Sequence, residues 1–148
     1  MTNPWPVLRR GSHGPDVTTL QFILRAARDA WRHLAADGDY GPKTEEIVRA
    51  FQGFAGITVD GVVGPVTWDK LTDGHTIGSI VRPGEHGDFV RAAQTELHKQ
   101  GYLAASGIDG IFGPHTEAAV RRFQEDVGLT VDGVVGPHTW RQLVTHKR

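Results

Sequence analysis

The eight histidines of the chain are the residues that most readily suggest metal chemistry. A catalytic zinc site needs about three ligands at a recognisable spacing, such as two histidines one helical turn apart with a glutamate nearby. None of the histidines is paired in this way, and solvated side chains explain them better. The sequence therefore predicts no metal site.

The carboxylates and hydroxyls offer no stronger case for catalysis. A glycosidase needs two carboxyl groups facing each other across a sugar cleft, whereas Glu45 and Glu46 are neighbours that diverge around a predicted helix. Asp37 resembles the start of a calcium loop, but Val48 stands where that loop needs glutamate. The serines lie in no nucleophile pattern, and there is no cysteine. We expect no catalytic residue, no cofactor and no enzymatic activity.

Composition excludes several further classes of function. The formal net charge is -1, and basic residues alternate with acidic ones, which is not typical of a nucleic-acid-binding surface. No stretch approaches the roughly 20 apolar residues that cross a membrane. The first ten residues lack the apolar run of a signal peptide. We therefore expect no nucleic-acid or membrane partner, and we expect a monomer.

The strongest signal in the chain is an internal repeat, which sequence analysis should seek first. Residues 41–71 and 113–143 match at 20 of 31 positions without a gap, at an offset of 72. The first part of each copy matches at an offset of 73, so one extra residue lies between Leu24 and Asp37. The chain is therefore a duplication, with a first repeat at residues 1–72, a linker at 73–79 and a second repeat at 80–148.

Each repeat is predicted to form three helices, which makes the fold all-α: two tandem three-helix bundles with glycine-rich turns. Apolar residues recur at three- and four-residue spacing from Val17 in the first copy and from Val90 in the second. Gly-Pro pairs open the second and third helices, since proline suits the first helical turn. The first copy lacks the Gly101-Tyr102-Leu103 segment of the second. We expect a longer first helix there, with Trp31 as a substitute anchor.

This ordered pattern resembles the bacterial peptidoglycan-binding domain family found beside amidases, carboxypeptidases and other wall hydrolases. The resemblance covers nearly the whole chain, twice. In the first repeat it rests on Gly14, Val17, Gln21, Leu24, Asp37-Gly38, Tyr40-Gly41, Thr44, Val48, Phe51-Gln52, Asp60-Gly61, Gly64-Pro65 and Thr67-Trp68. In the second it rests on Gly87, Val90, Gln94, Leu97, Asp109-Gly110, Phe112-Gly113, Thr116, Val120, Phe123-Gln124, Asp132-Gly133, Gly136-Pro137 and Thr139-Trp140.

The resemblance implies binding of a glycan strand or a stem peptide of the wall. Such ligands are held by a few polar groups beside an apolar shelf. The candidate polar groups are Thr44, Gln52 and Asp60 in the first repeat and Thr116, Gln124 and Asp132 in the second, with Tyr40 and Phe112 as the shelf at the rim.

Each candidate also has a structural reading. An aspartate before glycine commonly bonds its own backbone, and a threonine at a helix start can cap that helix. Phe51, Phe123, Trp68 and Trp140 lie at helical spacing and are expected in the core. Gln52 and Gln124 are the candidates that packing alone explains least.

Two functions follow from these patterns. The first is a non-catalytic module that tethers to the cell wall through two linked weak sites, whose linkage raises the effective concentration of the second. The second is a structural protein that uses the duplicated fold to dock onto a wall hydrolase or a phage-like assembly protein. We expect an extracellular or wall-associated location under the first hypothesis, and a cytoplasmic or phage-associated location under the second.

Overall fold

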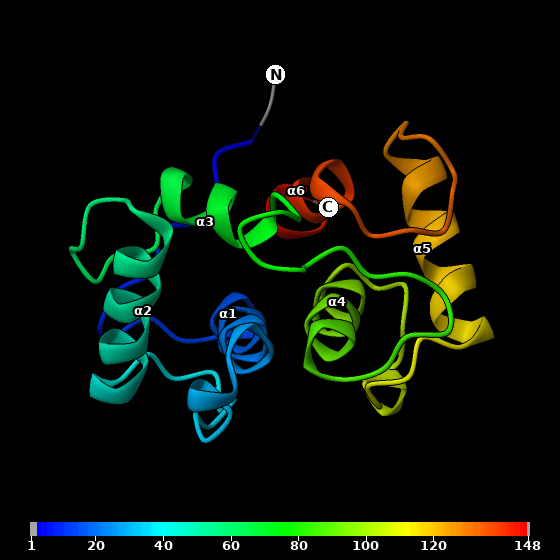
Figure 1. Ribbon diagram of the computed structural model, residues 1–148. Coiled ribbons are helices and arrows are strands. Elements are labelled where there is room, and N and C mark those ends of the chain that lie inside the picture. The colour runs from blue at the N-terminus through cyan, green and yellow to red at the C-terminus, as the bar shows by residue number, and fades with distance from the viewer. Residues whose placement is uncertain (1–2, 148) are drawn as a thin grey trace.

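The computed structural model describes residues 3–147, which form six α-helices and two short 3-10 helices without a β-strand (Figure 1). The predicted all-α fold of two three-helix bundles is confirmed. None of the helices within the described residues is long and apolar enough to cross a membrane. The first repeat contains α1 (Pro15–Ala27), η1 (Asp29–Trp31), α2 (Pro42–Ala55) and α3 (Pro65–Thr72). The second contains α4 (Asp88–Lys99), η2 (Ala105–Gly107), α5 (Pro114–Asp126) and α6 (Pro137–Thr145).

Gly-Pro pairs set the start of the second and third helix in both repeats. In α2, α3, α5 and α6 the glycine is extended and the proline is the first helical residue, where its missing N–H breaks no hydrogen bond. The end of α2 is set by Gly56, which adopts a left-handed conformation at φ 73°. These helix boundaries follow directly from local sequence.

The first helix is shorter than predicted. Arg28 is extended, with φ -148° and ψ 141°, so α1 ends at Ala27 and the chain turns back through η1. Arg25 holds this returning segment by donating to the carbonyl oxygen of Leu34 at 2.8 Å. The prediction of a longer helix is therefore wrong, because the extended Arg28 ends α1 and the chain reaches Trp31 through η1.

The predicted role of Trp31 as an anchor is confirmed. Its side chain is 7% exposed and its ring meets Phe51 edge-on, with the centroids 6.4 Å apart. In the second repeat Tyr102 meets Phe123 in the same way at 5.4 Å. Two different aromatic residues, reached by different backbone paths, thus cover the same phenylalanine of the duplicated core.

The segment before each first helix is fastened to the third helix of the same repeat. Trp68 donates its indole N–H to the Pro6 carbonyl at 2.7 Å, and Trp140 donates to the Ser79 carbonyl at 2.8 Å. Residues 73–79 join the repeats, and within them Ile77 and Ser79 are buried. The division of the chain at this segment stays a prediction.

The two repeats pack against each other through equivalent helices. The first helices, α1 and α4, lie side by side at the centre, and the third helices, α3 and α6, also meet (Figure 1). The second helices, α2 and α5, lie on the outside. Equivalent elements that face each other in this way define an approximate twofold arrangement, and the buried residues form one continuous core.

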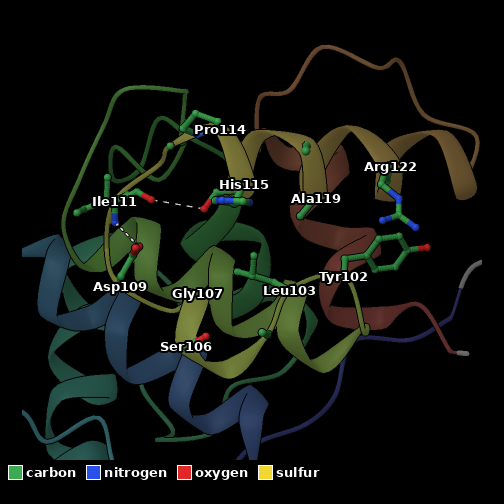
Figure 2. Close-up of a pocket in the computed structure, with 14 residues that line it drawn as sticks. Tyr102, Leu103, Ser106, Gly107, Asp109, Ile111, Pro114, His115, Ala119 and Arg122 are labelled. Carbon is green, nitrogen blue, oxygen red and sulfur yellow. Dashed lines mark hydrogen bonds between the residues drawn. The ribbon is translucent and has the colours of Figure 1, made fainter.

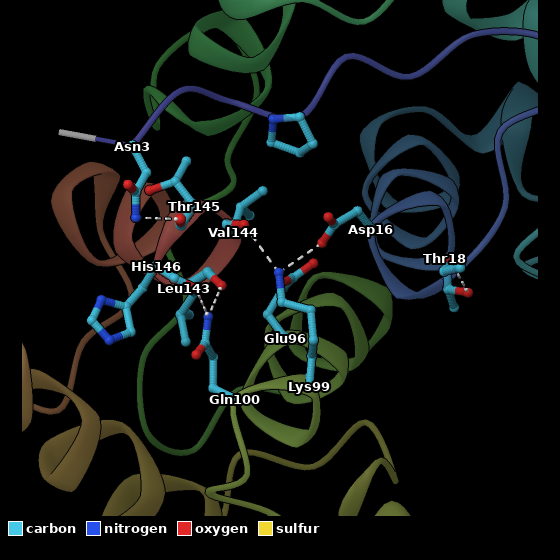
Figure 3. A network of polar contacts seen from close by, with 12 residues as sticks. Asn3, Asp16, Thr18, Glu96, Lys99, Gln100, Leu143, Val144, Thr145 and His146 are labelled. Atoms are coloured by element: carbon cyan, nitrogen blue, oxygen red, sulfur yellow. Dashed lines mark hydrogen bonds and ion pairs between the residues drawn. The ribbon is translucent and has the colours of Figure 1, made fainter. Parts of the chain in front are cut away.

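A buried charge cluster lies at the contact between α1 and α4. The ammonium of Lys99 lies 2.8 Å from Glu96 Oε1 and 2.9 Å from Asp16 Oδ1, and it donates to the Val144 carbonyl at 3.0 Å (Figure 3). Glu96 is 0% exposed. Burial, together with the neighbouring charge of Asp16, raises the pKa of Glu96 to about 8 against the opposing effect of Lys99. Ile23 occupies the equivalent position in the first repeat and is also fully buried.

The raised pKa of Glu96 predicts that the protein becomes less stable as pH rises. The folded chain binds this proton more tightly than the unfolded chain, whose glutamate titrates near 4.5. The stabilisation is therefore complete below about pH 4.5 and is lost as the pH approaches about 8. Denaturant unfolding at a series of pH values between these limits should show a free energy of unfolding that falls as pH rises, with Glu96 contributing to the slope.

The variant Glu96→Gln, which resembles the protonated acid, should lose this part of the slope and be more stable than wild type at pH 8. The control is Glu125→Gln, which alters an exposed glutamate on α5 and should keep the wild-type slope. An unchanged slope in Glu96→Gln would contradict the assignment.

Candidate functional site

The predicted candidates Gln52 and Gln124 are fully buried and organise the turns beside them. The Gln52 amide nitrogen donates to Asp60 Oδ1 at 2.9 Å, to the Val62 carbonyl at 3.0 Å and to Thr67 Oγ1 at 3.2 Å. Its amide oxygen accepts from the backbone N–H groups of Asp60 and Gly61. Gln124 makes the same contacts with residues 132–134 and Thr139. Burial of a polar side chain is stable here because its donors and acceptors are paired.

The same arrangement occurs twice more, after α1 and after α4. We call it the glutamine clamp: a buried helical glutamine that binds an Asp-Gly turn and the threonine of the following Gly-Pro-x-Thr helix start. In each clamp the glycine N–H is bound at 2.8–3.0 Å and the glycine is left-handed, at φ 73–78°. The four clamps are Gln21 with Asp37 and Thr44, Gln52 with Asp60 and Thr67, Gln94 with Asp109 and Thr116, and Gln124 with Asp132 and Thr139.

The other predicted site residues are divided between clamps and core. Thr44 and Thr116 are buried clamp threonines. Tyr40 and Phe112 are each 2% exposed, so they lie in the core and present no ring face at a rim. The Tyr40 hydroxyl donates to the Gly61 carbonyl at 2.6 Å, and burial, with the charge of Glu45, raises the pKa of Tyr40.

Only Asp60 and Asp132 among the eight candidates have exposed side chains. Hydrogen bonds from backbone N–H groups, of Val62 and Val134 respectively, are the leading reason why both pKa values are lowered. Both aspartates therefore stay ionised at the surface while they close their own turns. Ligand contact by the eight residues stays a prediction.

Asp60 and Asp132 each line a shallow cleft, which we call a turn cleft. The cleft of the first repeat has a volume of about 300 Å³ and that of the second about 340 Å³. Every lining position of one corresponds to a lining position of the other at the repeat offset of 72. The pairs are Ile57/Leu129, Thr58/Thr130, Asp60/Asp132, Val62/Val134, Gly64/Gly136, Pro65/Pro137, Val66/His138 and Thr67/Thr139.

A larger cavity lies along α5 in the second repeat, and we call it the α5 groove. Its volume is about 660 Å³, and residues 102–109 face α5 across it (Figure 2). Leu103, Ile111, Pro114 and Ala119 supply apolar lining, while Asp109, His115 and Arg122 supply polar groups. This combination of an apolar wall and a few polar groups is typical of a small-ligand site.

Both walls of the groove differ between the repeats: α5 carries two alanines where α2 carries larger residues, and residues 102–109 follow a different path from the segment after α1. At the repeat offset of 72, the groove residues Ala118, Ala119 and Arg122 correspond to Glu46, Ile47 and Ala50. Ile47 is 2% exposed and its larger side chain is part of the core. Replacing isoleucine by alanine removes three carbons from the wall, so space opens beside α5. The two repeats therefore share a fold and differ in their surfaces.

Sequence reasoning missed the α5 groove and the role of the glutamines as clamps, since it named Gln52 and Gln124 only as candidate ligand-binding groups and did not consider Gln21 and Gln94 as site residues. The clamps have a readable signal, since a glutamine followed by Asp-Gly-x-x-Gly-Pro-x-Thr occurs four times rather than twice. The groove has a weaker one, namely Ala118-Ala119 where the first repeat has Glu46-Ile47. No group of three or more metal-binding side chains gathers within residues 3–147.

Comparison with known proteins identifies the family of the chain. A family model described as "Putative peptidoglycan binding domain" matches residues 13–71 and 86–143. The chain therefore belongs to the peptidoglycan-binding domain family, of which it contains two tandem copies.

Several relatives are wall hydrolases that contain a similar segment. The chain is 40% identical over 64 residues to a zinc D-Ala-D-Ala carboxypeptidase of Streptomyces albus G, which covers 43% of this chain and 25% of the relative. It is 42% identical over 65 residues to the N-acetylmuramoyl-L-alanine amidase CwlL of Bacillus licheniformis, covering 44% and 18%. The chain thus spans a quarter or less of the length of these two relatives.

Solved structures give the same partial likeness. The SleB N-terminal domain is 38% identical, with 44% of this chain and 88% of that chain covered, at a TM-score of 0.42. A peptidoglycan-binding protein from Clostridioides difficile, in complex with glutamine hydroxamate, is 45% identical, with 44% and 40% covered, at a TM-score of 0.42. Each of these two matches covers 44% of this chain.

The clamp contacts predict a large loss of stability when a clamp glutamine is removed. Gln124→Ala leaves the buried Gly133 N–H and the Thr139 hydroxyl without their partner. We expect the free energy of unfolding to fall by about 3 kcal/mol or more, since each unsatisfied buried group costs about 1–3 kcal/mol. Chemical denaturation measures this change. Glu125→Ala on the exposed face of α5 is the control, and a comparable loss in both variants would contradict the clamp.

Proposed function

We propose that the chain is a non-catalytic module that tethers to peptidoglycan through two linked sites, the turn clefts of its two repeats. Membership of the peptidoglycan-binding domain family supports wall binding in general. The observation that carries the two-site proposal is the pairing of the clefts, in which all eight lining positions correspond. The duplicated surface thus matches a polymer that presents the same chemical unit many times.

The clamps suit the turn clefts to weak, repeated binding. The cleft walls contain an Asp-Gly turn whose backbone is held by a buried glutamine, so little conformational entropy remains to be lost on binding. The clefts are shallow, which predicts modest affinity at each one. Linkage of two such sites in one chain raises retention on a polymer without further contacts.

A wall-associated location follows from this proposal, and so does a partner of a particular kind. The amidase and carboxypeptidase relatives combine a similar segment with hydrolase activity in one longer protein. A module of this kind places whatever is attached to it, or bound to it, close to the polymer. A wall hydrolase is therefore the protein partner that we propose.

Blocking one or both turn clefts tests the two-site proposal. Val66 and His138 are exposed and occupy equivalent positions in the two clefts. Val66→Arg and His138→Arg each fill a cleft with a long side chain. Co-sedimentation with insoluble sacculi should show a partial loss of retention for each single variant and loss of about tenfold or more for the double variant, because linked sites multiply their effects.

The matched control is Val7→Arg, which adds the same charge at an exposed valine outside both clefts and should keep wild-type retention. Attraction of the added arginines to an anionic wall would raise retention, so a loss cannot come from net charge. Wild-type retention by the folded double variant would overturn the clefts as the sites. Failure of the wild-type protein to sediment would overturn wall binding.

A further inference from the structure

The α5 groove runs along one face of α5 and has polar side chains at both of its ends. His115, Ala119 and Arg122 lie at spacings of four and three residues, so they share one face of α5 (Figure 2). The rise of 1.5 Å per residue separates His115 from Arg122 by about 10 Å along the helix. That distance corresponds to about three residues of extended peptide.

One end of the groove is cationic. Arg122 is exposed, and within residues 3–147 its guanidinium forms no hydrogen bond or ion pair. The carboxylate one turn further along α5, Asp126, accepts a hydrogen bond from the Tyr102 hydroxyl at 2.5 Å. A guanidinium beside an apolar wall binds a carboxylate well, because two parallel N–H groups match its two oxygens.

The other end of the groove is anionic. Asp109 is exposed and lies near Ile111 and His115, at the opposite end from Arg122 (Figure 2). Its Oδ1 accepts hydrogen bonds from the Ile111 N–H at 2.9 Å and from Gln94 at 3.0 Å. Backbone hydrogen bonding by Ile111 is the leading reason why the pKa of Asp109 is lowered. Its remaining oxygen faces solvent and is suited to a ligand amine.

We propose that the α5 groove binds the peptide branch of peptidoglycan, as a short peptide that places a free carboxylate on Arg122 and an amine near Asp109. This inference rests on the proposed wall-binding function and names the part of the polymer that the second repeat recognises. The charges at the two ends complement such a peptide, and Ala119, which lies between His115 and Arg122 on α5, offers an apolar contact along the groove.

The glycan strand fits the groove less well. The N-acetylated sugars of the strand have no free amine to pair with Asp109. Where peptides are linked to the strand by amides, the sugars also have no free carboxylate to pair with Arg122. Sugar rings also favour an exposed aromatic face beside a few polar groups. Tyr102 is the aromatic residue of the groove, and its ring is half-buried with Phe123 packed edge-on at 5.4 Å.

Amide chemical-shift titrations of the intact chain test the proposal with three soluble probes. The first is the tripeptide L-Ala-γ-D-Glu-L-Lys. The second is the same tripeptide with its amines acetylated and its carboxylates amidated, so that it carries no charge. The third is the tetramer of N-acetylglucosamine. The tripeptide should shift amides around Leu103, Ile111 and Ala119, whereas the neutral analogue should bind about tenfold more weakly or worse, since charge-assisted hydrogen bonds are lost.

Arg122→Gln should weaken binding of the tripeptide by about tenfold. Arg121→Gln is the matched control on the same helix, because Arg121 pairs with Glu117 and does not line the groove. Ala119→Ile, which introduces the residue of the first repeat, should also abolish the shifts by filling the groove. Unfolding curves of each variant show whether it is folded.

Two outcomes would overturn the inference and leave the proposed function standing. One is a groove that responds to the sugar tetramer but not to the tripeptide, while sacculi still retain the chain through Val66 and His138. The other is tripeptide binding that is equal in wild type and in folded Arg122→Gln. Absence of retention on sacculi would instead overturn the proposed function itself.

Discussion

The glutamine clamp is the interaction on which the rest of this structure depends. A helix of about a dozen residues buries one face but leaves the path of the following chain undetermined. The buried amide fixes that path, because it binds both sides of an Asp-Gly turn and the threonine that starts the next helix. Four such clamps position the second and third helix of each repeat, and with them the turn clefts and one end of the α5 groove.

The clamp also explains why residues of the types that are common in binding sites lie in the interior of this protein. Glutamine, aspartate, threonine and tyrosine are the side chains that proteins use to hold sugars and peptides. In this fold Gln52 and Tyr40 bind backbone groups of their own repeat, and Thr44 accepts a hydrogen bond from the buried Gln21 side chain. These side chains therefore use their hydrogen bonds to fix the turns. The surface keeps the clefts beside those turns and a few charged groups.

The helices could be predicted from the local sequence, whereas the α5 groove could not. Helix starts at Gly-Pro follow from the chemistry of proline, and the core follows from apolar spacing, so both could be read from the chain. The end of α1 at Ala27 could not, because the extended Arg28 is fixed by the return of the chain toward Leu34 and Trp31. The α5 groove also depends on tertiary packing, since Ala119 creates space only where residues 102–109 fold over α5.

The pairing of α1 with α4 has a consequence for how such a chain can evolve. In a symmetric dimer of single repeats, any residue at the central contact would occur on both sides, so Glu96 would face a second buried glutamate position. Covalent fusion removes that constraint: α1 carries Ile23 where α4 carries Glu96. Lys99 of α4 pairs with Glu96 on its own helix and, across the contact, with Asp16 of α1. A single chain can thus hold an asymmetric contact between two equivalent helices, which two identical subunits could not form.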